Sequence, residues 1–323
     1  MSEKKQDSIK LRTIFMGTSS FSESILKSLI DAQYNIISVY TQKDKKVGRK
    51  QELQKSAVKI LAEKNHIPVY EPVRFNDEVI DEAKKQKPDI MIVAAYGKIL
   101  PKAILELPGF GAINVHTSLL PKYRGPSPIQ NAILNGEKET GATIMLMDEG
   151  IDTGAILAQE KIDINENDTT QSLSEKLAQI SSDLLLEIIP LVAKRKINPQ
   201  SQDNNLATLC QLIERSDGKI MWSDEAESIY NRYRAFSPWP GIYAFWENGD
   251  AIKRIKFKKI SLAKNNPQTQ YHIGEVFQIG ENYGVQTALG AIILHEIQIE
   301  GKDPADIKAF ANGYPNFVGS ILK

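Results

Sequence analysis

A short, almost uniformly apolar segment sets the strongest limit on how this chain folds. It is DIMIVAA, from Asp89 to Ala95, which has the length of a strand but no alternation of apolar and polar positions. A strand that is apolar on both faces has to be covered on both faces, as a central strand of a parallel α/β sheet is. The segment therefore predicts an open sheet with helices on both sides.

The chain around this segment alternates between strand-like and helix-like stretches. A strand at 11–17 is followed by an amphipathic stretch at 21–32 and a second strand at 36–40, the order of a βαβ unit. The first turn, GTSSFS, lacks the GxGxxG fingerprint of dinucleotide-binding proteins. We expect further helices at 56–65, 76–86, 99–107, 127–134 and 172–194, and further strands at 68–70, 111–116, 143–147 and 156–162. Pro190 should kink or end the last helix. The pattern predicts a mostly parallel sheet with flanking helices.

The length of 323 residues suits roughly two domains of about 100 to 200 residues each. The stretch NPQSQDNN at 198–205 is polar and rich in residues that break regular structure, so it is the expected linker. Beyond it, several short strands follow a rigid SPWPG turn, which indicates a small β-barrel or sandwich. We expect an N-terminal α/β domain at 1–195, a linker at 196–208 and a C-terminal domain at 209–323.

Charge and composition exclude several classes of protein. The chain has 40 Lys and Arg against 40 Asp and Glu, so no global field attracts a polyanion or an anionic membrane, and any contact with nucleic acid requires a local patch. Cys210 is the only cysteine, which excludes a disulfide framework or a cysteine-based metal cluster and fits a reducing compartment. No apolar run approaches the length of a membrane span. We expect a cytoplasmic monomer with no membrane partner.

Two local segments are strongly basic. The loop between Lys43 and Lys55 carries six basic and two acidic residues and no apolar period, which indicates a flexible, net-positive loop. It fits either solvated surface or an element that grips phosphates. In IKRIKFKKI at 252–260, apolar residues alternate with lysines, so one face of a strand enters a core and the other offers ammonium groups to solvent. Such lysines also protect edge strands from aggregation, and both interpretations stay open.

Three polar residues form the candidate site. Asn114 and His116 lie two apart at the carboxyl end of an expected strand, so they share a face at the edge where open α/β sheets bind ligands. Asp152 lies in the loop EGIDTG, whose glycines let the backbone approach a substrate. An amide, an imidazole and a carboxylate are therefore able to converge. Taken alone, the pattern also fits ordinary polar surface.

This set of groups suits acyl transfer. Histidine exchanges protons near neutral pH, and a nearby carboxylate fixes its orientation. The Asn114 amide is able to donate a hydrogen bond to a developing oxyanion. The sequence has no GxSxG, HExxH or P-loop motif and no Cys–His pairing, so the residues for covalent or metal-dependent catalysis are missing. Direct transfer without a covalent enzyme intermediate fits best.

Long motifs in both halves resemble a known family. NVHTSLLPKYRGPSPIQ at 114–130 and TGATIMLMDEGIDTG at 140–154 resemble the signature of the 10-formyltetrahydrofolate-dependent formyltransferases. The resemblance extends to VAAYGKILP at 93–101, IFMGTSSFS near the start, VYTQKDKKVGRK at 39–50 and AFSPWPG at 235–241, and is strongest to the members that act on methionyl-tRNA. Thr117 stands where the family often has glycine, and TSSF replaces the TPEF of many members.

The resemblance implies a function and a set of site residues. Asn114, His116 and Asp152 would be catalytic, 10-formyltetrahydrofolate the formyl donor, charged initiator tRNA the acceptor, and no metal would take part. The fold would be Rossmann-like, with an OB-like β-barrel as the C-terminal domain. The folate pocket would be lined by Ser118, Leu119, Leu120, Pro121, Ala95, Tyr96, Gly97, Glu149, Gly150 and Ile151. The tRNA would be bound by Lys43, Lys45, Lys46, Arg49, Lys50, Lys253, Arg254, Lys256 and Lys258.

Two alternatives compete with this interpretation. Relatives with the same Asn, His and Asp formylate other amines, and a formyltransferase that acts on a nucleotide-linked amino sugar is the main rival, because its class also has a second domain. A non-catalytic RNA-binding protein would keep the lysine faces, but would have no use for NVH together with DEGIDTG.

Overall fold

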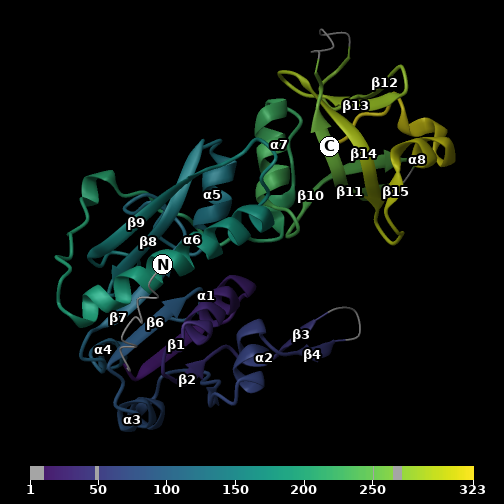
Figure 1. Cartoon of the computed structure of the whole chain (residues 1–323). Helices are drawn as coiled ribbons and strands as arrows, with labels where there is room; N and C mark the ends of the chain where they lie inside the picture. Colours follow the sequence, from purple (N-terminus) through teal and green to yellow (C-terminus); the bar gives the residue numbers. More distant parts are fainter. Residues whose placement is uncertain (1–10, 48–50, 250, 265–270) are drawn as a thin grey trace, which may run out of the picture. The chain divides into compact units, whose positions relative to one another are not determined.

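The computed structural model describes residues 11–47, 51–249, 251–264 and 271–323 (Figure 1). The chain forms two compact units that interleave along the sequence. The first comprises Met1–Pro128, Glu139–Asp163 and Ser174–Gln211, and the second comprises Ile129–Lys138, Ile164–Leu173 and Leu212–Lys323. The expected domain boundaries at 195 and 209 stay a prediction.

The first unit is built on a seven-stranded sheet in the order β5-β2-β1-β6-β7-β8-β9. Neighbouring strands are parallel as far as β7, and β8 and β9 are antiparallel, so the expected mostly parallel sheet is confirmed. Residues Ile90–Ala94 of the apolar segment form β6, the middle strand, and all five are buried. The strands are β1 (Thr13–Gly17), β2 (Ile36–Tyr40), β5 (Val69–Tyr70), β6 (Ile90–Ala94), β7 (Ala112–His116), β8 (Glu139–Leu146) and β9 (Ile156–Asp163).

Both faces of this sheet are covered. On one face, Ile14 and Met91 belong to a core cluster that includes residues of the helices α3 and α4. Their neighbours Phe15 and Ile92, which point to the opposite face, are equally inaccessible to solvent. The helices of this part of the chain are α1 (Ser20–Asp31), α2 (Ala57–Lys64), α3 (Asp77–Lys85), α4 (Lys102–Leu105), α5 (Pro128–Leu134) and α6 (Thr170–Ala193). Of these, α5 falls almost wholly in the second unit.

One helix differs from expectation, and a second continues past its proline. The segment expected as a helix at 99–107 forms only the single turn α4, which begins after Pro101. Pro190 lies inside α6, and the helix continues to Ala193 before it ends. A proline near the end of a helix removes one backbone donor, and the last turn is able to continue past it.

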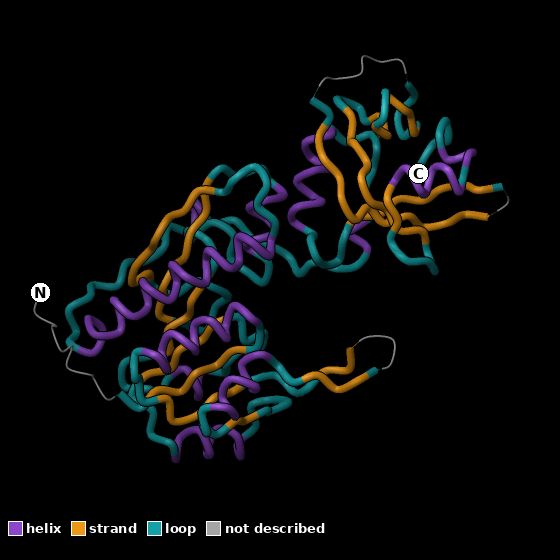
Figure 2. The backbone as a smooth tube through the Cα atoms, turned by 45° about the vertical axis from the view of Figure 1, so that its right-hand side comes forward, coloured by secondary structure: helices purple, strands orange, loops and turns teal. Residues whose placement is uncertain are grey.

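The basic loop contains a hairpin that was not expected. Lys45–Val47 forms β3, which pairs in antiparallel fashion with β4, Glu52–Gln54. Figure 2 shows the two strands running out together from the first unit. The expectation of an irregular loop was therefore wrong for these residues. Three-residue strands with little apolar content carry no periodic signal, because backbone hydrogen bonds alone define them.

The second unit contains an antiparallel half-barrel sheet in the order β10-β11-β14-β13-β12, with β15 paired to β14. This confirms the smaller β domain that was expected. In β11, Ile255 and Phe257 are buried while Lys258 is exposed, as the alternation predicted. The elements are α7 (Ala226–Ala235), β10 (Ile242–Asn248), β11 (Ala251–Leu262), β12 (Val276–Ile279), β13 (Asn282–Gln286), β14 (Ala291–Ile299), β15 (Ala305–Asp306) and α8 (Ile307–Gly313).

An aromatic cluster closes the core of the second unit. The ring of Trp246, on β10, is fully buried. Its centroid lies 6.0 Å from that of Phe310, 5.5 Å from that of Tyr314 and 5.2 Å from that of Phe317, all in edge-to-face geometry. Such pairs add to the stability gained from burial. Trp246 therefore connects the sheet to α8 and the chain that follows it.

We predict that Trp246→Ala destabilises the second unit. Removing a large buried aromatic side chain leaves a cavity and should cost about 3–5 kcal/mol of unfolding free energy. Urea denaturation followed by far-UV circular dichroism measures the effect. Trp239→Ala is the matched control, because the Trp239 side chain is 51% exposed and its loss should change stability by about 0.5 kcal/mol or less. Equal losses in the two variants would contradict the packing role.

Candidate active site

β7 presents two of the candidate residues on one face. Its neighbours are β6, which is parallel, and β8, which is antiparallel. Asn114 is half-buried, and His116, the last residue of the strand, is only 6% exposed. The two side chains thus lie at the carboxyl end of a strand in the interior of the sheet, where α/β proteins bind ligands.

The structure brings Asp152 to these two residues. The amide Nδ2 of Asn114 donates to Asp152 Oδ1 over 3.2 Å. The other carboxylate oxygen, Oδ2, lies 3.6 Å from Nδ1 of His116. The side chain of Asp152 is 16% exposed, so the carboxylate is largely removed from water. The three groups therefore form one cluster.

The imidazole of His116 is oriented by the backbone. Its Nε2 lies 2.9 Å from the carbonyl oxygen of Tyr123. A carbonyl oxygen only accepts, so Nε2 carries a hydrogen in this arrangement. The other ring nitrogen, Nδ1, faces the Asp152 carboxylate at a distance too long for a good hydrogen bond. A proton taken up by Nδ1 would lie directly beside a negative charge.

A glycine completes the environment of the carboxylate. The N–H of Gly125 donates to Asp152 Oδ2 over 2.8 Å. Gly125 has a φ of 114°, which L side chains rarely adopt, and a Cβ there would lie 2.4 Å from the carbonyl oxygen of Cys210. Only glycine brings its amide this close to Asp152. The carboxylate thus accepts two hydrogen bonds and remains close to the histidine.

The segment at 118–121, which was expected to line a folate pocket, is held by hydrogen bonds from β8 and β9. The hydroxyl of Ser118 donates to the carbonyl of Lys122 over 2.6 Å. Thr143 Oγ1 donates to the carbonyl of Ser118 over 2.6 Å, and the side-chain amide of Gln159 donates to that of Leu120 over 2.9 Å. The hydroxyl of Ser118 therefore stabilises the loop itself. Sequence reasoning missed Thr143 and Gln159, because their partners lie 25 and 39 residues away in the chain.

The loop at 95–97, which was also expected to line the folate pocket, makes a sharp bend. Tyr96 is only 2% exposed and its ring belongs to the core cluster, where burial raises the pKa of the phenol. Its carbonyl accepts from the hydroxyl of Thr18 over 3.1 Å and from the side-chain amide of Gln42 over 2.9 Å. Ala95 and Gly97 both have positive φ, which gives the chain a sharp bend. The Tyr96 side chain is thus buried in the core, and the backbone around it makes a sharp bend.

The loop before Asp152 is partly exposed. Glu149 forms an ion pair of 2.9 Å with Lys102, and Ile151 is 64% exposed. The N–H of Gly150 donates to the carboxylate of Asp148 over 3.0 Å. Ile151 is therefore the apolar side chain of this loop that is free to contact a ligand.

The basic residues lie in two places. Lys43, Lys45 and Lys46 are exposed in and beside the β3–β4 hairpin, whereas Arg49 and Lys50 lie outside the described residues. In the second unit, Lys253, Arg254, Lys256 and Lys258 lie on β11.

Burial and neighbouring cations both act on the pKa of Lys256. Its pKa is lowered first by burial and then by the positive charges of Arg254, Lys258 and Arg215. A lysine whose neighbours repel it marks a surface where positive charge is concentrated. Arg215 was missed by sequence reasoning because it lies far from β11 in the chain.

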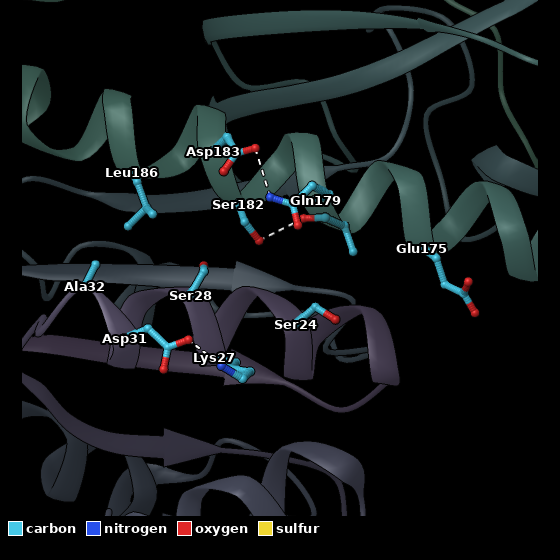
Figure 3. A pocket seen from close by; sticks show the side chains of 11 residues that line it. Ser24, Lys27, Ser28, Asp31, Ala32, Glu175, Gln179, Ser182, Asp183 and Leu186 are labelled. Atoms are coloured by element: carbon cyan, nitrogen blue, oxygen red, sulfur yellow. Dashed lines mark hydrogen bonds and ion pairs between the residues drawn. The ribbon is translucent and has the colours of Figure 1, made fainter.

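Two cavities lie away from these residues. The larger, of about 520 Å³, is formed by α1 and α6 (Figure 3), and Lys27, Asp31, Gln179 and Asp183 are among its lining residues. A smaller one, of about 260 Å³, is bounded by Tyr40, Tyr70 and three glutamates. Neither is lined by any of the expected site residues, so neither changes the position of the candidate site.

Within the described part of the chain, no group of three or more His, Cys, Asp or Glu residues is placed to hold a metal ion. Over the same residues, no helix has the length and apolar character needed to cross a bilayer.

Comparison with known proteins gives matches along nearly the whole chain. A family model described as formyl transferase matches residues 10–189, and one described as formyl transferase, C-terminal domain, matches residues 212–315. The methionyl-tRNA formyltransferase of Caldicellulosiruptor saccharolyticus is 42% identical over 96% of this chain and 99% of its own length. That of Citrifermentans bemidjiense is 37% identical over 97% of this chain and 96% of its own.

Solved structures share the fold at lower identity. An N-formyltransferase from Helicobacter canadensis, in complex with folinic acid and dTDP-3-aminofucose, has a TM-score of 0.65 at 23% identity, covering 88% of this chain and 98% of that one. HypX from Aquifex aeolicus, in complex with tetrahydrofolic acid, has a TM-score of 0.65 at 15% identity, covering 96% of this chain and 48% of that one. These two likenesses concern the fold. The identity to relatives matched from end to end goes further, and with both family models it shows that the chain belongs to the methionyl-tRNA formyltransferase family.

Proposed function

We propose that this protein transfers the formyl group of 10-formyltetrahydrofolate to the α-amine of methionine carried by initiator tRNA. The observation that supports this most is the cluster of Asn114, His116 and Asp152 in a chain 42% identical to a methionyl-tRNA formyltransferase. The reaction serves the start of translation, and we therefore place the protein in the cytoplasm. We propose that it acts as a monomer.

The three residues suit attack by an amine on a formyl carbon. The amine nitrogen forms a bond to the carbon, and the former carbonyl oxygen becomes an oxyanion. The Asn114 amide and a protonated His116 would donate to it. Asp152 accepts the proton that the amine loses, and the proton then goes to the folate nitrogen as its bond to carbon breaks. The Asn114 and Gly125 donors hold the carboxylate in place for this step.

The loops around the cluster are proposed to hold the formyl donor. The segment from Ser118 to Pro121 follows His116 after one residue, and Thr143 and Gln159 fix its backbone. Across the site, Ala95 to Gly97 and Glu149 to Ile151 would supply backbone groups and the exposed Ile151 side chain. A folate has a flat ring and polar edges, so apolar side chains beside exposed backbone suit it.

The second unit is proposed to hold the tRNA. Positive charge is concentrated around Lys256, where Arg254, Lys258 and Arg215 lower its pKa. Such a surface binds phosphates without reading sequence. The lysines of the β3–β4 hairpin form a second basic surface, in the first unit, which we propose as a further contact with the tRNA.

One other acceptor has a specific observation in its favour. The structure from Helicobacter canadensis, which carries dTDP-3-aminofucose, shares the fold. That likeness is at 23% identity, against 42% for the tRNA enzyme, so methionyl-tRNA is the better-supported acceptor. Incubating the protein with the formyl donor and either charged initiator tRNA or an amino-sugar nucleotide, followed by mass spectrometry of both acceptors, decides between them.

We predict that His116→Ala abolishes formyl transfer while tRNA binding persists. Loss of a positioned acid–base group costs about 10²- to 10⁴-fold in rate. Formyl-methionyl-tRNA formed per unit time gives the rate, and a filter-binding titration gives the affinity for tRNA. His66→Ala is the control, since His66 is an exposed histidine in the same unit. Turnover by His116→Ala at the rate of the unmodified protein would reject the assignment.

We predict that Lys256→Ala weakens tRNA binding and reduces its dependence on salt. Each phosphate contact adds about one unit to the slope of log affinity against log salt concentration, so the slope should fall by about 1. Lys308→Ala is the control, because Lys308 lies in the same unit but is neutralised by Glu281 at 2.7 Å. The same slope in Lys256→Ala and the unmodified protein would contradict a phosphate contact at Lys256.

A further inference from the structure

We propose that Gln202 is a positioning residue, which holds the Asp152 loop in the conformation that the reaction requires. Its catalytic consequence rests on the function proposed above. Gln202 lies in the polar segment at 198–205 that the sequence indicated as a linker. Within the first unit, this segment contacts the loop that carries Asp152 and the loop that contains Arg124, and Gln202 binds both.

The amide nitrogen of the Gln202 side chain binds the Asp152 loop. Its Nε2 donates to the carbonyl of Asp152 over 2.9 Å and to the carbonyl of Gly154 over 2.8 Å. Both N–H groups of the amide are thereby used on one short stretch of backbone. Gln202 is half-buried, so these bonds are partly shielded from competing water.

The Asp152 loop needs such support. Asp152 has a φ of 52°, a left-handed conformation that residues other than glycine seldom adopt. Two residues later the chain is pressed against β8, since a Cβ on Gly154 would lie 1.8 Å from the carbonyl oxygen of Leu146. A strained backbone persists only where its surroundings hold it. Gln202 binds the carbonyls on both sides of this strained stretch.

The amide oxygen of the Gln202 side chain binds Arg124. The guanidinium Nε and Nη2 of Arg124 donate to Gln202 Oε1 over 3.0 Å and 2.8 Å. Arg124 is only 6% exposed, and its Nη2 also donates to Oδ1 of Asn204 over 2.9 Å. Two N–H groups of this buried guanidinium thus converge on one oxygen of Gln202.

Arg124 stands between the two residues that serve the catalytic groups. The carbonyl of Tyr123 accepts from His116, and the N–H of Gly125 donates to Asp152. Gln202 therefore connects the backbone that orients the histidine with the backbone that carries the aspartate. The terminal amide of Gln202 thus makes four hydrogen bonds, two from its nitrogen to the Asp152 loop and two at its oxygen from Arg124.

Neighbouring residues of the same segment add to this connection. Gln200 exchanges two backbone hydrogen bonds of 2.8 Å with Ile156, at the start of β9. Thr208 Oγ1 accepts from the N–H of Tyr123 over 2.8 Å, and the carbonyl of Thr208 accepts from the N–H of Arg124 over 2.9 Å. Both loops of the site are thus tied to residues 200–208, with Gln202 as the only side chain among these contacts that reaches both.

Gln202→Glu tests the proposal sharply. The carboxylate keeps the shape of the side chain and its bonds to Arg124, but places an acceptor against the carbonyls of Asp152 and Gly154. We expect kcat to fall by about 10- to 100-fold with little change in KM for either substrate, because a misplacement of about 1 Å costs on the order of 10²-fold. Asn204→Ala is the control: it removes a bond to the same arginine and leaves Gln202 in place, so its kcat should stay within about twofold of the unmodified value.

A second measurement does not depend on turnover. The ring resonances of His116, followed by NMR against pH, report the position of the Asp152 carboxylate, and we expect them to shift in Gln202→Glu and not in Asn204→Ala. Unchanged His116 titration together with unchanged kcat would overturn the proposal, and so would a rise in KM at constant kcat, which would make Gln202 a substrate-binding residue. If Gln202→Glu does not fold, Gln202→Met, which removes all four bonds without adding charge, takes its place.

The two measurements separate this proposal from the proposed function. Failure of the unmodified protein to formylate charged initiator tRNA would refute the function. The comparison of His116 spectra between the unmodified protein and its Gln202 variants would still decide whether Gln202 positions the Asp152 loop.

Discussion

The carboxylate of Asp152 is the group on which the candidate site depends. Removing an anion from water is costly unless hydrogen bonds replace the lost hydration. Here Asn114 and Gly125 supply those bonds, and His116 stands beside the second oxygen. The requirement fixes much of the surrounding structure: a strand that ends in an amide and an imidazole, a glycine with a conformation closed to other residues, and a loop bent so that the aspartate points inward.

The sequence predicted the framework of this arrangement well. The uniformly apolar β6 indicated a central strand, and the seven-stranded order places it in the middle of the sheet. The spacing of Asn114 and His116 on a strand also predicted a shared face, and the loop glycines around Asp152 indicated a close approach. Each of these inferences depends on local periodicity or on the backbone freedom of single residues, which a sequence displays directly.

Other parts of the site could not be predicted. Thr143, Gln159 and Gln202 act through hydrogen bonds to backbone groups far away in the chain. Arg124 acts through hydrogen bonds to the side chain of Gln202. The pattern of a sequence does not predict such contacts. The β3–β4 hairpin escaped prediction for the same reason, because its strands are defined by backbone pairing. The contacts of the segment at 198–205 were not predicted either, since the polar residues that indicate a linker are also suited to bind carbonyl groups.

The place of that segment between the two family regions has a practical consequence. The N-terminal family region ends at 189 and the C-terminal one begins at 212, so neither contains Gln202, Thr208 or Cys210. Yet these residues bind the backbone that orients the histidine and the backbone that carries the aspartate. A fragment that ends at residue 189 would contain Asn114, His116 and Asp152 but would lack the residues whose hydrogen bonds align them. An N-terminal fragment intended to be active therefore has to extend through Cys210.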